Sequence, residues 1–132
     1  MSKLIKGTHH VSLKCDSVEL FQKTLDFYLN TLGLELVRTW GEGEKSAAMI
    51  STGNSIIEVF AWGRTSEKTG SVNHFALATD DVDQCIETVR KIGCPVTVEP
   101  KDVVIGSAIP FPARVAFCVG PVGEEIEFFC EK

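Results

Sequence analysis

The chain has 132 residues, of which 44% are hydrophobic and 23% are charged, and its formal net charge is −5. This composition is typical of a globular protein, and the acidic balance without a basic stripe argues against a nucleic-acid partner. No apolar run approaches the roughly 20 residues of a membrane span, so no membrane partner is expected. The amino end lacks the apolar core of a signal peptide, and the five cysteines form no Cys-x-x-Cys pair. These features favour reduced thiols and a cytoplasmic location.

The first half of the chain is predicted to form a strand, a helix and three further strands. The opening strand covers Thr8–Lys14, where apolar and polar residues alternate. Asp16 stands three residues before Glu19, a spacing typical of a helix N-cap and its reciprocal partner. Apolar residues then recur at helical spacing as far as Gly33, which is expected to end the helix. The three later strands are expected at residues 34–40, 47–51 and 56–62.

The second half is predicted to repeat this order. Val72–Thr79 reads as a strand, Asp80 as the cap of a helix, and Gly93 as the residue that ends it. Strands are then expected at Pro95–Val98, near Val103–Ile105, at Arg114–Val119 and at Glu125–Cys130. The stretch 105–112 has two prolines and is expected to be a loop, while Gly63–Gly70 is expected to join the halves. The sequence therefore predicts one domain, residues 1–132, made of a module at 8–62 and a module at 71–131.

An internal repeat supports this division. The phrase His10–Glu19 recurs 64 residues later as His74–Asp83, and Ile57–Phe60 is echoed by Ile126–Phe129. A phrase that recurs at a fixed period indicates a duplicated structural unit. Each copy carries one histidine and one glutamate at matched positions.

Strand alternation places these four side chains on the face away from the helices. In the opening strand Val11 and Leu13 are expected to face the helix, which leaves His10 on the opposite face. Ser12 and Lys14 share that opposite face. The same alternation in three other predicted strands places Glu58, His74 and Glu127 on the face away from the helices.

A lone histidine or glutamate in a strand is more often structural or solvated than a ligand. Two of each at matched positions of a duplicated motif are better explained as a metal site. Ni²⁺, Co²⁺, Zn²⁺, Mn²⁺ and Fe²⁺ all accept such ligands, so the pattern predicts one divalent ion per site. By the same alternation His9 faces the helix side of its strand, so it is not a candidate metal ligand. Phe60, Trp62 and Phe129 are candidate substrate contacts, with packing or a dimer interface as the alternative.

The chain resembles the vicinal oxygen chelate superfamily, the glyoxalase, bleomycin-resistance and extradiol-dioxygenase group, from Thr8 to Glu131. The phrases that carry the resemblance are His10–Leu13, Phe27–Leu34, Ile57–Phe60, Asn73–Leu77 and Gly123–Phe129. The resemblance implies an α+β fold in which two tandem βαβββ modules form an eight-stranded incomplete barrel, with a metal in its cup. It also implies a homodimer, since members often pair modules from two chains.

Within the group, the ligand set resembles that of bacterial-type glyoxalase I, whose His, Glu, His, Glu pattern corresponds to His10, Glu58, His74 and Glu127. This implies a metal-dependent lyase or isomerase that acts on the adduct of a 2-oxoaldehyde and a thiol through an enediolate. Glu127 is the expected catalytic base, with Glu58 as the alternative. Lys14 occupies the position of an arginine in many glutathione-using relatives, so it is a substrate-binding candidate and the thiol stays open. Two alternatives stay open as well, namely another metal enzyme of the scaffold (an epimerase or a dioxygenase) and a metal-free small-molecule binding protein.

Overall fold

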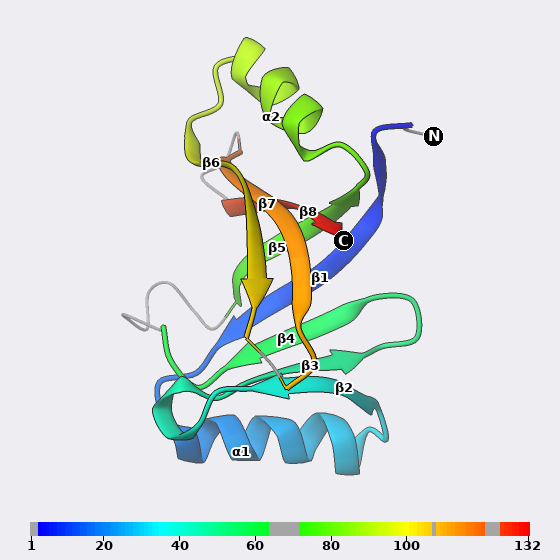
Figure 1. The fold of residues 1–132 in the computed structure, drawn as a ribbon. Coiled ribbons are helices and arrows are strands. Elements are labelled where there is room, and N and C mark those ends of the chain that lie inside the picture. The colour runs from blue at the N-terminus through cyan, green and yellow to red at the C-terminus, as the bar shows by residue number, and fades with distance from the viewer. Residues whose placement is uncertain (1–2, 64–71, 107, 121–124) are drawn as a thin grey trace. The chain divides into compact units, whose positions relative to one another are not determined.

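The computed structural model describes residues 3–63, 72–106, 108–120 and 125–132. Two modules follow each other along the chain, each with the order strand, helix and three strands (Figure 1). The α+β class and the two βαβββ modules predicted from the sequence are therefore confirmed. The expected connection Gly63–Gly70 lies, apart from Gly63, outside the described residues. No helix in the described part of the chain is long and apolar enough to cross a membrane.

The chain divides into two compact units, and the boundary falls within the first strand, between His9 and His10. The unit that begins at His10 holds most of the first module. Its elements, with their full bounds, are β1 (Ile5–Lys14), α1 (Val18–Asp26), β2 (Glu35–Trp40), β3 (Ala47–Ser51) and β4 (Ile56–Phe60). The strand order is β2-β3-β4-β1, with β1 parallel to β4 and the other pairs antiparallel.

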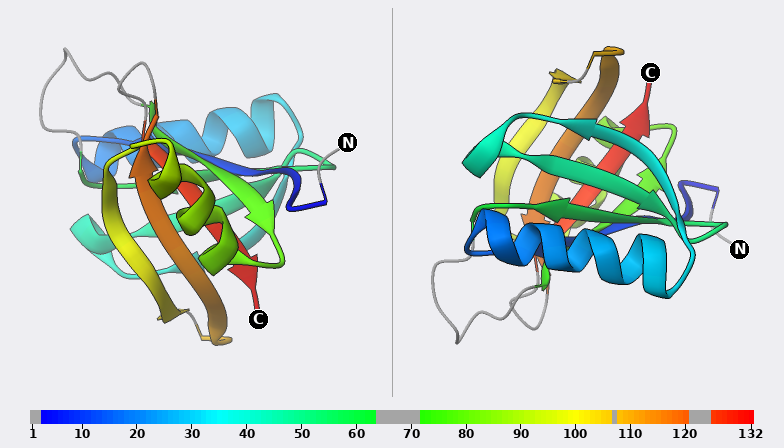
Figure 2. Two further views of the ribbon diagram at one scale, coloured as in Figure 1. Left: turned by 90° about the horizontal axis from the view of Figure 1, so that it is seen from above. Right: turned by 90° about the horizontal axis from the view of Figure 1, so that it is seen from below.

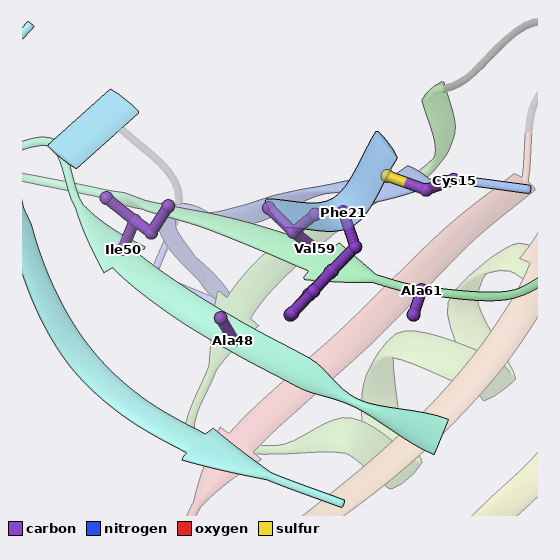
Figure 3. Close-up of a cluster of buried hydrophobic side chains, with 6 residues drawn as sticks. All are labelled: Cys15, Phe21, Ala48, Ile50, Val59 and Ala61. Atoms are coloured by element: carbon purple, nitrogen blue, oxygen red, sulfur yellow. The ribbon is translucent and has the colours of Figure 1, made fainter. Parts of the chain in front are cut away.

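Helix α1 lies against this sheet (Figure 2), and a hydrophobic cluster joins the two (Figure 3). Phe21 is the buried residue of α1, and Ala48 and Ile50 are two residues apart on β3, so they lie on the same face of the sheet. Val59 contributes from β4. The remaining buried members are Cys15 and Ala61. Burial of this apolar surface is the main favourable term that stabilises the unit.

The second module has the same organisation. Its elements are β5 (Val72–Thr79), α2 (Val82–Lys91), β6 (Val96–Ile105), β7 (Phe111–Val119) and β8 (Glu125–Glu131). The strand order is β5-β8-β7-β6, and β5 is parallel to β8. Helix α2 packs against β6, β7 and β8 (Figure 2). The buried cluster beneath it consists of Val82, Cys85, Ile86, Ala116, Cys118 and Phe128.

Both helices begin one residue later than the sequence predicts. Ser17 is the N-cap of α1 and accepts a hydrogen bond from the Leu20 amide at 3.0 Å. Asp81 is the N-cap of α2 and accepts from the Gln84 amide at 3.0 Å. Serine and aspartate are both strong N-cap residues, and before each helix two such residues stand side by side. The predicted caps, Asp16 and Asp80, were therefore wrong by one position.

Each helix ends just before a glycine, as predicted. Gly33 and Gly93 have φ angles of +75° and +89°, a backbone conformation that glycine adopts without a Cβ clash. Before Gly33, α1 continues into a π-helical turn, Phe27–Thr31, which the apolar spacing did not predict.

Strand β6 is continuous where two separate runs were predicted. Pro100 lies inside it, next to two register shifts in its pairing with β7. Because β6 is at the edge of its sheet, the missing N–H of proline and the irregular register are tolerated there. Strand β7 likewise begins at Phe111, so the expected loop 105–112 is shorter than predicted.

Candidate metal centre

The first histidine–glutamate pair lies on adjacent parallel strands. His10 is on β1 and Glu58 on β4, where the ladder pairs Glu58 with Ser12. The His10 Nε2 atom lies 3.5 Å from the Glu58 Oε1 atom. Both residues are buried, at 0% and 5% relative exposure. An imidazole and a carboxylate are thus held together in the interior, where an isolated charge would be costly.

The second pair is built in the same way. His74 is on β5 and Glu127 on β8, where the ladder pairs Glu127 with Ala76. The His74 Nε2 atom lies 2.9 Å from the Glu127 Oε2 atom, and both residues are buried. The ring of Phe117 packs edge-on against the imidazole of His74, with centroids 5.4 Å apart.

The two pairs occupy equivalent positions of the repeated module. In each, the glutamate is in register with the residue two positions after the histidine, so both side chains lie on one face of the parallel strands. Imidazole nitrogens and carboxylate oxygens are ligands of first-row divalent metals. The chemistry of this donor set therefore fits a divalent ion.

Lys14 lies beyond the first pair, on the same side of β1, and contacts aromatic rings. Its Nζ atom is 3.5 Å from the centre of the Phe60 ring and 5.9 Å from that of Trp62, within the range of cation–π attraction. The two rings pack edge to face at 4.9 Å. The Lys14 side chain passes close to the backbone of Gly63. A Cβ atom at that position would lie only 2.9 Å from the lysine side chain. Three predicted substrate contacts, Lys14, Phe60 and Trp62, are thus brought together.

Two neighbours of this cluster were not found from the sequence. The Trp40 ring lies 5.9 Å from that of Phe60, and the Lys45 Nζ atom lies 5.7 Å from the Trp62 ring. Trp40 ends a predicted strand, so its aromatic side chain was the sequence feature that could have indicated this contact. Lys45 lies in a 3-10 turn, Gly43–Lys45, where no periodicity marks its direction.

The remaining predicted contact, Phe129, lies in a different environment. It is 1% exposed and its ring is 4.2 Å from His9 and 5.8 Å from Phe111. The His9 Nε2 atom also lies 2.8 Å from the Glu131 Oε1 atom. His9 is therefore engaged by a carboxylate and an aromatic ring outside the two pairs. Substrate contact by Phe129 stays a prediction.

Comparison with known proteins places the chain in a family. The model of the Glyoxalase/Bleomycin resistance protein/Dioxygenase superfamily matches residues 7–128. The chain belongs to this superfamily, as its sequence phrases indicated. It is similar to a lactoylglutathione lyase of Escherichia coli O157:H7, with 30% identity over 119 residues and 84% of each chain covered.

Solved structures share the fold. Methylmalonyl-CoA epimerase from Mycobacterium tuberculosis is 19% identical with a TM-score of 0.73, over 100% of this chain and 92% of that chain. The Mn(II)-bound glyoxalase from Novosphingobium aromaticivorans is 22% identical with a TM-score of 0.71, over 96% of this chain and 39% of that one. At these identities the likeness establishes the fold alone.

Proposed function

We propose that this protein is a metal-dependent lyase of glyoxalase I type. The observation that carries the proposal is the recurrence of one buried histidine–glutamate pair at the same strand register of both modules. In this proposal His10, Glu58, His74 and Glu127 together hold one divalent ion, chosen from Ni²⁺, Co²⁺, Zn²⁺, Mn²⁺ and Fe²⁺. The similarity to a lactoylglutathione lyase supports the reaction class.

The proposed substrate is the adduct of a 2-oxoaldehyde with a thiol. A bound divalent ion would polarise the two neighbouring oxygens of the adduct and make its C–H bond more acidic. Glu127 takes the proton from the carbon that carries the sulfur and returns it to the adjacent carbonyl carbon, while the hydroxyl proton of the adduct moves to the former carbonyl oxygen. The product is a hydroxyacyl thioester, and no oxidant or reductant is consumed. Glu58 is the alternative base, because the two carboxylates occupy equivalent positions.

The side chains beyond the first pair would bind the rest of the substrate. The Lys14 ammonium is proposed to pair with a carboxylate of the thiol, while Phe60 and Trp62 contact its apolar part. Phe129 is proposed as a further apolar contact from the second module. A lysine acts as a point charge and lacks the bidentate fork of arginine, so several acidic thiols are candidate cosubstrates.

The test is a direct assay of thioester formation from methylglyoxal. The purified protein, loaded in turn with each of the five metals, is incubated with methylglyoxal and with glutathione or another thiol. We expect thioester formation that depends on added metal. In D₂O, deuterium at the new C–H bond measures how far the proton held by Glu127 exchanges with solvent before it is returned.

Three other outcomes would replace the proposal. Solvent exchange at a carbon next to a thioester, without thiol addition, would indicate an epimerase. Oxygen consumption with Fe²⁺ would indicate a dioxygenase. Tight binding of a small molecule without any metal would indicate a binding protein and would end the enzyme proposal.

We also propose that the protein is a cytoplasmic homodimer. Support comes from the frequent pairing of modules from two chains within the superfamily. Light scattering coupled to size-exclusion chromatography measures the mass in solution. Twice the chain mass of 14.4 kDa is expected, and a monomeric mass would contradict the proposal.

A further inference from the structure

Ser12 carries a buried hydroxyl group without a hydrogen-bond partner. The residue is 0% exposed, and across the described residues no atom lies within hydrogen-bonding reach of its Oγ in suitable geometry. Buried polar groups are almost always hydrogen-bonded, and an exception indicates a missing water, ion or ligand or a functional role. The hydroxyl of Ser12 therefore calls for a partner other than the residues that the structure describes.

The position of Ser12 indicates where that partner binds. Ser12 lies between His10 and Lys14 on alternate positions of β1, so the three side chains share one face. On β4 it is in register with Glu58. The hydroxyl thus lies beside the first histidine–glutamate pair, on the path from that pair to the Lys14 ammonium.

The second module supplies an internal control for packing. Its equivalent residue is Ala76, which is in register with Glu127 as Ser12 is with Glu58. Ala76 is also 0% exposed. An alanine therefore fills this position of the fold, and packing does not require the hydroxyl at Ser12.

We infer that the Ser12 hydroxyl donates a hydrogen bond to an oxygen atom of the ligand that binds at the His10–Glu58 pair. This inference rests on the proposed function and deepens it, because it assigns a ligand-binding role to a residue of the first module alone. The ligand class is a small molecule with two neighbouring oxygens, one of which receives the hydrogen bond. Ser12 then fixes which of the two ligand oxygens lies beside β1.

Binding of acetohydroxamate, a two-oxygen chelator, to the Ni²⁺-loaded protein tests the inference without turnover. In the Ser12→Ala variant we expect the dissociation constant of acetohydroxamate to rise about three- to tenfold, as for loss of one neutral hydrogen bond. The affinity of this variant for Ni²⁺ alone should stay within about twofold of that of the unmodified protein, because the substitution of Ser12 removes no metal ligand. The melting temperature of the metal-free variant should be unchanged or higher, since a buried unpaired hydroxyl has been removed.

The matched control is Ala76→Ser, which adds a hydroxyl at the equivalent position. It should lower the melting temperature and leave acetohydroxamate binding unchanged. Unchanged acetohydroxamate affinity in Ser12→Ala would overturn the inference. So would an equal loss of Ni²⁺ affinity, or an equal weakening of acetohydroxamate binding by Ala76→Ser.

Failure of the proposed function is recognised separately, in the unmodified protein. If that protein binds Ni²⁺ and acetohydroxamate but forms no thioester, the lyase proposal fails while the role of Ser12 is still decided by the variants. If it binds no metal, both proposals are overturned before any variant is made.

Discussion

The two modules share their histidine–glutamate pair but differ in what surrounds it. In the first module the positions two and four residues after the histidine are Ser12 and Lys14, whereas in the second they are Ala76 and Ala78. The ladders place these residues opposite the same partners, a glutamate and then a phenylalanine. The pair is thus common to both copies, while polar groups suited to ligand recognition are concentrated in the first. In the proposed function, both modules would supply metal ligands, whereas the polar substrate contacts would come from the first module.

The helices differ in a similar way. Phe21 of α1 and Cys85 of α2 are equivalent in the repeat and both are buried. A large aromatic side chain therefore anchors one helix, whereas α2 relies on Val82 and Ile86 beside a small residue. The two copies preserve the same architecture with different packing.

The largest effect is expected from removing the proposed catalytic base. Glu127→Gln should lower kcat by about 10²- to 10⁴-fold, the usual contribution of a positioned general base, while some metal binding persists through the amide oxygen. Glu58→Gln is the matched variant in the other module and should lower kcat less. Steady-state kinetics together with metal content measure both effects. A larger loss of kcat in Glu58→Gln would assign the proton transfer to Glu58.

Core truncation should show the difference between the helices. Phe21→Ala should lower the free energy of unfolding by about 3–5 kcal/mol, because it leaves a large cavity. The equivalent change Cys85→Ala removes about one methylene-sized group and should lower it by about 1 kcal/mol. Urea unfolding of both variants measures the difference. Halves of this size are marginal alone, so a single cooperative transition is expected, and two separate transitions would contradict one folding domain.

Removal of the Lys14 ammonium should affect substrate recognition selectively. Lys14→Ala should lower kcat/KM about three- to tenfold for adducts of acidic thiols, in line with a partly exposed charge contact. Adducts of a neutral thiol such as 2-mercaptoethanol should react at an unchanged rate. Lys6→Ala, which removes an exposed lysine paired with Asp80 at 3.0 Å, is the control. Equal losses for acidic and neutral thiols would argue against a carboxylate contact.

The smallest effect concerns an ion pair of the second module. The Arg114 guanidinium donates to both carboxylate oxygens of Asp83, at 2.7 and 2.9 Å, and holds the pKa of that carboxyl below its usual value. The resulting stabilisation is complete above about pH 4, the pKa of an unfolded aspartate, and is lost as the pH falls through the lower folded-state pKa. Since Asp83 is largely exposed, solvent screening keeps the effect small.

The Asp83→Asn variant measures the stabilisation that the Asp83–Arg114 ion pair provides. The difference in unfolding free energy between the unmodified protein and this variant should shrink as the pH is lowered from about 7 to about 2. Glu19 is equivalent to Asp83 in the first module and pairs with the exposed Lys23 amine at 3.4 Å, so Glu19→Gln is the matched control variant. An equal dependence in both variants would contradict the special role of the Arg114 contact.

The sequence predicted the modules and the four candidate ligands because both depend on short-range patterns. Alternation in β1 correctly placed Leu13 on the helix side, and the repeat aligned Glu58 with Glu127. Gly33 and Gly93 marked the helix ends because only their backbone conformation was needed there.

Features that depend on tertiary contacts were missed. Two separate strands were predicted where β6 is continuous, because its edge position, which tolerates Pro100 without an N–H, could not be known from the sequence. Contacts of Lys45 and Trp40 with the aromatic cluster join elements far apart in sequence. The lack of a hydrogen-bond partner for the Ser12 hydroxyl among the described residues could be recognised only once its surroundings were known.

Metal stoichiometry tests most directly the central claim that the two pairs act as one centre. Purified protein is titrated with Ni²⁺ and its metal content measured, alongside His10→Ala and His74→Ala, which remove one ligand from each module. A single shared centre predicts about one ion per chain and a large loss of affinity in both variants. Two ions per chain, or full binding retained when either histidine is replaced, would show that the pairs are independent and would contradict the account.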